Sequence, residues 1–156
     1  MSEAFALKTW RRLSGTAAGR WLFSRIVCFK APYFSSIRPT FDVLEPGRAA
    51  AHFRKRRRVT NHIGTVHAIA MANLCELVAG TMTEVSVPGS MRWIPKSMTI
   101  DYLRKAETDV RAEARLAPVR EGEEQDAVVS VDVFDDAGER VVRADITMYV
   151  SPKKQK

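Results

Sequence analysis

The sequence has few cysteines, no long apolar run and no internal repeat. Its 156 residues include two cysteines, Cys28 and Cys75, which lack the spacing of metal ligands. This excludes a disulfide-stapled scaffold and a zinc ribbon. No apolar run approaches the roughly 20 residues that a membrane-spanning helix needs. We therefore expect one globular domain, without a metal site, in a reducing compartment such as the cytoplasm.

Acidic residues are absent between positions 4 and 41, although the whole chain has 18 Asp and Glu against 25 Lys and Arg. A basic excess speeds encounters with anionic partners, whether nucleic acid, anionic lipid or a phosphorylated cofactor. The densest basic run, residues 54–58, contains no aromatic side chain. A nucleic-acid surface would be expected to interleave basic and aromatic residues. We therefore do not expect nucleic acid as a partner.

The first 37 residues form a segment of their own, in which apolar residues recur at helical spacing and arginines fill the gaps. Trp10, Leu13, Ala17 and Trp21 follow that spacing. The pattern predicts a basic amphipathic helix that packs on its own domain, which we favour, or lies on a membrane surface. A transit-type leader is a further alternative, because the segment is rich in arginine and poor in acids.

The middle of the chain is mostly apolar between Gly64 and Gly80, which predicts a helix buried on most of its sides. The helix follows a capping region at Thr60 and Asn61 and closes on a glycine, a common residue at a helix end. A carboxylate inside such a helix is costly unless it is paired or used. Glu76 therefore stands out as a candidate functional residue.

The rest of the pattern is one of short strands bounded by turn residues. Strands are expected at residues 41–44, 48–58, 84–87, 98–103, 110–116, 127–134 and 142–150. Residues 38–151 should then form an α+β domain whose antiparallel sheet wraps around the helix, followed by a polar tail over 152–156. Because the sheet edges need covering, a homo-oligomer is the expected state.

Polar groups at the start of the buried helix are candidates for chemistry. A helix N-terminus presents unpaired N–H groups and the positive end of its dipole, which suit an oxyanion or a polarised carbonyl. Asn61, His67 and the Ala68 N–H lie at this end. Glu76 follows His67 by nine residues, which places the two on opposite sides of the helix. If both act, we expect them in two different active sites, each completed by the other subunit of a dimer.

Asn61, Gly64, His67 and Glu76 together resemble the central-helix signature of hotdog-fold acyl-CoA thioesterases. In the phenylacetic-acid-degradation type, the pattern is Asn, then Gly-x-x-His-Gly, then an acidic residue nine positions after the His. These four residues occur in register here, and Ala68 replaces the second glycine. The sequence is most similar to the domain-of-unknown-function 4442 branch, and the resemblance covers residues from about 40 to 150.

The resemblance implies a hotdog-fold hydrolase of acyl-CoA thioesters that needs no cofactor beyond the coenzyme A of its substrate. It also implies a dimer, or a dimer of dimers, with shared active sites. Glu76 would act as general base on water or as nucleophile, and the Ala68 N–H would polarise the thioester carbonyl. His67 would position the helix turn or the thioester, and Asn61 would orient the water or the carboxylate.

Substrate contacts are also expected from the glycine of the motif and from basic side chains that suit the phosphates of coenzyme A. These residues are Gly64, Arg54, Arg56, Arg57, Arg58, Arg104 and Lys105.

Other interpretations stay open at this point. A non-catalytic acyl-CoA or fatty-acyl binding module on the same fold is the main alternative, because a fold does not fix a function. A membrane-associated interaction protein acting through residues 1–37 is another. Glu76 could instead be paired across a dimer interface, and His67 could simply cap the helix.

Overall fold

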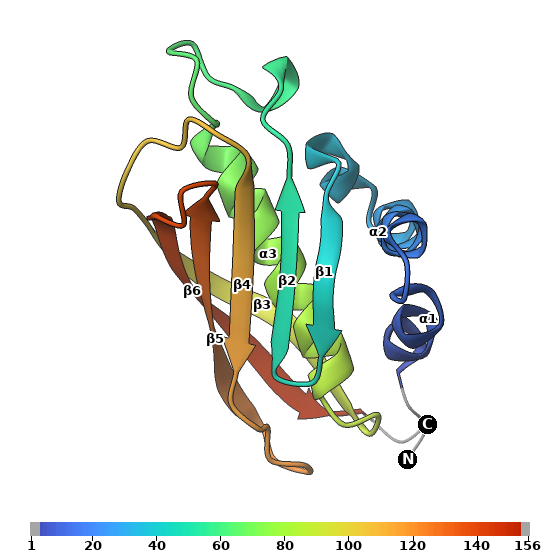
Figure 1. Cartoon of the computed structure of the whole chain (residues 1–156). Coiled ribbons are helices and arrows are strands. Elements are labelled where there is room, and N and C mark those ends of the chain that lie inside the picture. The colour runs from blue at the N-terminus through green and yellow to red at the C-terminus, as the bar shows by residue number, and fades with distance from the viewer. Residues whose placement is uncertain (1–3, 154–156) are drawn as a thin grey trace.

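The computed structural model describes residues 4–153, which form three α-helices, two short 3-10 helices and a six-stranded sheet (Figure 1). The helices are α1 (Phe5–Leu13), α2 (Ala17–Lys30), η1 (Pro32–Ile37), η2 (Arg57–Val59) and α3 (Ala68–Ser86). The strands are β1 (Thr40–Glu45), β2 (Arg48–Phe53), β3 (Met91–Tyr102), β4 (Val110–Leu116), β5 (Gln125–Asp135) and β6 (Arg140–Pro152).

The sheet is antiparallel throughout and has the strand order β1-β2-β4-β5-β6-β3. It wraps around α3, which contacts all six strands, while α1 and α2 lie beside β1 (Figure 1). The apolar faces of the strands meet the apolar helix, which removes both from water. The expected α+β domain with a sheet wrapped around one long helix is confirmed.

The alternating patterns of the later strands predict their buried faces. In β4 the buried side chains alternate with more exposed ones from Val110 to Leu116. In β6 the predicted positions from Val142 to Val150 are all buried. The Pro46–Gly47 turn also forms as expected, joining Glu45 to Arg48, with Gly47 at a φ of 80° that a glycine adopts without strain.

The central helix differs from its predicted bounds at both ends. It begins at Ala68 rather than near residue 64, because the His67 side chain accepts a hydrogen bond from the Ile69 N–H and caps it. It continues past Gly80 to Ser86, so the strand predicted at 84–87 is the last helical turn. Gly80 does not end the helix; it makes room for the Trp93 ring, which would lie 3.2 Å from an added Cβ.

The sequence was expected to hold no apolar run long enough to cross a membrane, but α3, alone among the helices of residues 4–153, is long and apolar enough to do so. Its burial accounts for this composition. Leu74, Leu77, Val78 and Met82 are fully buried between the sheet and the N-terminal helices. We therefore interpret α3 as the core helix of the domain.

Three other strand boundaries also differ from the prediction. β2 ends at Phe53, and the basic run that follows enters η2 instead of prolonging the strand. β3 begins at Met91, seven residues before its predicted start, because residues 94–99 of this edge strand are all exposed and a bulge between Pro95 and Ser97 breaks the alternation. β6 extends to Pro152, although the polar tail was expected to begin at that residue. Residues 154–156 of the expected tail lie outside the described part of the chain.

The N-terminal segment contains two helices rather than one. Thr16 caps α2 by accepting a hydrogen bond from the Gly19 N–H at 3.0 Å. Trp10, Phe23 and Phe41 pack edge to face, with ring centroids 5.1–6.5 Å apart, and join α1 and α2 to β1. The favoured interpretation, that this segment packs on its own domain, is confirmed for residues 4–37.

Helices α1 and α2 are in close contact at Gly19. A Cβ at this position would lie 1.9 Å from the Leu13 carbonyl oxygen, whereas a Cβ at Gly15 would meet nothing within 4 Å. We predict that Gly19→Ala lowers the free energy of unfolding by about 3 kcal/mol. That corresponds to a melting temperature roughly 6–12 °C lower for a chain of this size.

Gly15→Ala is the matched control, because it adds the same methyl group in open space. We expect it to change the free energy of unfolding by less than about 0.5 kcal/mol. Thermal denaturation of the two variants checks this. Equal melting temperatures would contradict the packing of α1 on α2 described here.

Candidate functional site

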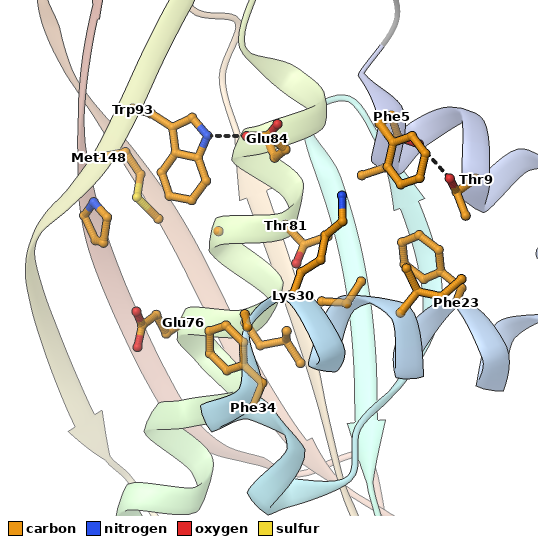
Figure 2. Close-up of a pocket in the computed structure, with 17 residues that line it drawn as sticks. Phe5, Thr9, Phe23, Lys30, Phe34, Glu76, Thr81, Glu84, Trp93 and Met148 are labelled. Carbon is orange, nitrogen blue, oxygen red and sulfur yellow. Dashed lines mark hydrogen bonds between the residues drawn. The ribbon is translucent and has the colours of Figure 1, made fainter.

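An apolar cavity of about 430 Å³ lies between the N-terminal helices, α3 and the start of β3 (Figure 2). Its volume falls within the range of pockets that hold small organic ligands. Helix α2 presents Phe23, Ile26 and Val27 to it, and Phe34 of η1 closes one side. The N-terminal segment therefore supplies about half of the residues that line the cavity.

Glu76 provides a carboxylate at one end of this cavity, next to Phe34 (Figure 2). The side chain is half-buried, and within residues 4–153 it makes no hydrogen bond or ion pair. A carboxylate beside an apolar surface loses hydration and gains nothing from a partner, so its position costs stability. An arrangement of this kind is typical of a functional group.

The other end of the cavity holds a second carboxylate, which is already engaged. Glu84 accepts a hydrogen bond from the Trp93 indole N–H at 2.8 Å (Figure 2). Eight residues of helix separate Glu76 from Glu84, or about 12 Å along the axis. Lys30 and Phe5 also line the cavity, and the Lys30 ammonium lies 4.2 Å from the centre of the Phe5 ring. The cavity is thus an elongated apolar space with one unpaired carboxylate.

His67 and Ala68 lie away from the Glu76 cavity. His67 lines a separate cavity of about 180 Å³ with residues of η1 and η2, and the two cavities share no lining residue. The Nδ1 atom of His67 accepts the Ile69 N–H at 3.1 Å, which leaves Nε2 for other contacts. Within one chain, Glu76 and His67 therefore face different spaces, as their helical spacing predicts.

Asn61 and Gly64 shape the loop that leads to His67. The Asn61 side-chain oxygen accepts the N–H groups of Ile63 and Thr65, and its amide nitrogen donates to the Thr65 hydroxyl at 2.8 Å. Gly64 has a φ of 80°, where a side chain would be strained. Asn61 thus holds this loop together, and it does not cap α3 as the sequence suggested.

Three arginines lie near one another beside the smaller cavity, which Arg58 lines, and their charges repel. Burial and the nearby Arg38 and Arg58 guanidinium groups lower the pKa of Arg56. One terminal nitrogen of Arg56 donates to the Ser36 carbonyl oxygen at 2.7 Å, whereas the other is buried without a partner. An anion bound here would relieve both the repulsion and the unpaired donor.

The other predicted basic contacts are more dispersed. Arg54 and Arg57 are exposed, and Arg104 pairs with Glu139 at 3.2 Å. Lys105 lies on the loop after β3, where the Ala106 carbonyl accepts the Val66 N–H at 2.8 Å. The η2 segment also lies next to the start of α3, since the Val59 carbonyl accepts a hydrogen bond from the His67 N–H at 2.8 Å. Basic residues therefore flank the N-terminus of α3 on two sides.

Neither cysteine is placed to act as a nucleophile. Cys75 is fully buried in α3, and burial raises the pKa of its thiol to about 12. Burial also raises the pKa of Cys28. Among residues 4–153 no group of three or more His, Cys, Asp or Glu side chains could hold a metal ion.

Strand β3 leaves one edge of the sheet open. At the other edge β1 is covered by α2, but within the described chain β3 pairs only with β6. Ile94, Met98 and Tyr102 of β3 are exposed. A twelve-residue edge strand whose outer side is unpaired and whose apolar side chains are exposed is a surface that a second chain readily completes.

Sequence reasoning did not find the cavity walls or the third arginine. Phe23, Trp93 and Glu84 come from three separate elements, and Arg38 follows η1 in the left-handed region. A second apolar stripe on α2, besides the one that packs on the domain, was the available signal. The sequence hides this stripe, because α1 and α2 follow each other closely and together resemble one helix with one apolar face.

Comparison with solved structures places the fold. The protein APC5556 is 46% identical and superimposes with a TM-score of 0.82, covering 95% of this chain and 98% of that one. PA5026 of Pseudomonas aeruginosa, described as a probable thioesterase of unknown function, is 25% identical with a TM-score of 0.76, over 83% of this chain and 93% of that one. The thioesterase HI1161 of Haemophilus influenzae shares the fold at 13% identity and a TM-score of 0.68, over 77% and 82% of the two chains.

A search of curated proteins returned no match. The structural likeness to thioesterases confirms the hotdog fold that the motif around His67 implied. Residues 19–150 match the model of one family over most of the chain. The protein therefore belongs to the family described as domain of unknown function 4442 (DUF4442), within the thioesterase-like hotdog proteins.

Proposed function

We propose that the protein hydrolyses acyl-CoA thioesters, with Glu76 as the general base that activates water. The observation that carries the proposal is an unpaired carboxylate at the end of an elongated apolar cavity. The cavity suits an apolar acyl group, and the carboxylate lies where the thioester carbonyl of that group would reach.

The reaction needs water as its only co-reactant. Glu76 takes a proton from a water molecule whose oxygen attacks the thioester carbon. The carbonyl oxygen becomes negative and is stabilised by an N–H group at the N-terminus of α3, of which Ala68 is the first helical residue. The C–S bond then breaks, and the departing thiolate receives the proton from Glu76. The products are a carboxylic acid and the free thiol of coenzyme A.

Glu76 and Ala68 come together only if two copies of the chain combine. Pro95 of β3 lines the Glu76 cavity, whereas the Tyr102 hydroxyl, at the other end of β3, donates to the Ala68 carbonyl at 3.2 Å. Antiparallel pairing of two β3 edges about a two-fold axis near Met98 sets each Pro95 beside the Tyr102 end of the other copy. It thereby brings the Glu76 of one subunit towards the Ala68 of the other, and a dimer of dimers would keep this pairing.

The phosphates of coenzyme A would bind at the basic residues around the start of α3. Arg56 offers an unpaired donor, and Arg38 and Arg58 add charge beside it. Arg104 and Lys105 lie on the opposite flank of the same helix end. His67 and Asn61 act here as positioning residues, because one caps α3 and the other holds the preceding loop.

Removing the base without changing its shape tests the role of Glu76. We predict that Glu76→Gln lowers kcat for thiol release from acyl-CoA by about 10²–10⁴-fold, the contribution expected of a general base. The melting temperature should stay unchanged or rise, because an unpaired half-buried charge is lost. Thiol release measured with a chromogenic disulfide checks this, and both buried cysteines keep the background low.

Glu84→Gln is the matched control, since it neutralises the other carboxylate of the same cavity and can still accept the Trp93 N–H. We expect it to change kcat by only a few fold. Equal losses in the two variants would contradict the assignment of Glu76. If the wild-type protein bound acyl-CoA without releasing thiol, the proposal would fail in favour of the non-catalytic binding module.

A mixture of two inactive variants tests whether active sites are shared. Ala68→Pro removes one N–H group but keeps the helix, because proline is tolerated at the first helical position and His67 is already extended. We predict that Ala68→Pro and Glu76→Gln are each inactive, and that unfolding and refolding them together restores about one quarter of the wild-type activity. Half of the random dimers would be mixed, and each would hold one intact site.

The restored activity should depend on mixing before refolding. Variants refolded separately and then combined serve as the control, and we expect them to stay inactive over the time that subunits need to exchange. An absence of restored activity in co-refolded dimers would place Glu76 and Ala68 in the same chain and contradict the shared site.

A further inference from the structure

The outer face of α2 is apolar and exposed. Ala18, Leu22 and Phe29 recur at helical spacing about a quarter turn away from the cavity-lining side chains, and Trp21 lies farther round the helix on the same exposed side. Phe29 is 90% exposed, Trp21 56% and Leu22 45%. Large apolar side chains that are exposed together on one helix face mark an interaction site more often than apolar side chains that are exposed singly. We call Trp21, Leu22 and Phe29 the outer patch.

Helix α2 therefore has two apolar faces with different partners. Phe23, Ile26 and Val27 face the cavity, whereas the outer patch faces away from the domain. The Arg25 guanidinium lies 5.9 Å from the centre of the Trp21 ring and also donates to the Pro39 carbonyl. The Trp21 ring is thus held at the surface although water surrounds much of it.

The charge around the outer patch has one sign. Between residues 4 and 41 the sequence has no Asp or Glu. Its charged residues there are Lys8, Arg11, Arg12, Arg20, Arg25, Lys30 and Arg38. Lys8, Arg12 and Lys30 are exposed, and α1 and α2 lie side by side along one flank of the molecule (Figure 1). Exposed aromatic and aliphatic side chains within a basic field are the features of a helix that lies in the surface of an anionic bilayer.

A second protein chain fits these features less well. This chain's own acidic residues lie mostly between 107 and 145, and several already pair with arginines of the same chain, as Glu113 does with Arg111 and Asp132 with Arg140. The open edge available for pairing is β3, whereas α2 covers the opposite edge strand, β1. The outer patch is therefore left for a partner that supplies both negative charge and an apolar interior.

We propose that the outer patch docks the protein on anionic phospholipid membranes. Trp21, Leu22 and Phe29 enter the boundary between head groups and acyl chains, while the exposed Lys8 and Arg12 of α1 contact the lipid phosphates. This inference does not depend on thioester hydrolysis, because it concerns the outer face of α2 rather than the cavity.

Sedimentation of the full-length protein with vesicles tests this proposal. We expect it to bind phosphatidylcholine vesicles that contain phosphatidylserine and not vesicles of phosphatidylcholine alone, and we expect added salt to weaken the binding. Replacing Trp21, Leu22 and Phe29 together by serine should lower the binding constant at least a hundredfold, since each contributes a large apolar side chain. Val128→Ser is the matched control, because Val128 is 54% exposed on β5, far from α2 in the sheet order.

Three results would overturn the proposal. The first is that the wild-type protein fails to bind anionic vesicles, and the second is that the triple variant binds as well as the wild type. The third is that the triple variant has a smaller mass than the wild type by light scattering without vesicles, which would make the outer patch an interface between copies. An unchanged melting temperature shows that the triple variant is folded, and thiol release by both proteins shows separately whether the site is intact.

Discussion

The structure depends on one constraint, which is that α3 must be buried on nearly every side while it carries an unpaired carboxylate. The sheet covers most of the helix, and α1 and α2 cover part of what remains. The aromatic contacts of Trp10, Phe23 and Phe41 fix these two helices to β1. The space left between them and α3 is the cavity with Glu76 at its end. Stability and a candidate site thus arise from the same packing.

The geometry of a helix also underlies the proposal that two subunits share each site. A carboxylate and a helix N-terminus that lie on different faces of one helix cannot meet at a single thioester group. The proposed pairing of two β3 edges would solve this, because its two-fold axis would set the middle of one α3 against the start of the other. The open β3 edge and the unpaired Glu76 are therefore two parts of one explanation. In a single chain, the open edge exposes apolar surface and the unpaired carboxylate lowers stability. In the proposed dimer the edge is paired and the carboxylate takes part in the reaction.

Much of the fold could be predicted from the sequence, because half-buried strands show a period of two. The buried faces of β4 and β6 follow from alternation alone. The start of β3 could not be predicted, since residues 94–99 are all exposed at an open edge and a bulge between Pro95 and Ser97 breaks the alternation. The prediction that α3 ends at Gly80 was wrong. The glycine is needed there because the Trp93 ring, which is distant in sequence, packs against it. Glu76 was predictable as a charge in an apolar helix, but the cavity walls depend on contacts between α2 and α3 that no local pattern encodes.

The most direct test of the account is a crystal structure with a non-hydrolysable thioether analogue of an acyl-CoA. The account predicts that the acyl chain fills the cavity beside Phe23 and Phe34. The sulfur should lie between Glu76 of one subunit and the N-terminus of α3 of the other, with the phosphates near Arg56 and Arg58. An analogue bound with its acyl chain outside this cavity, or with its sulfur far from Glu76, would contradict the central claim.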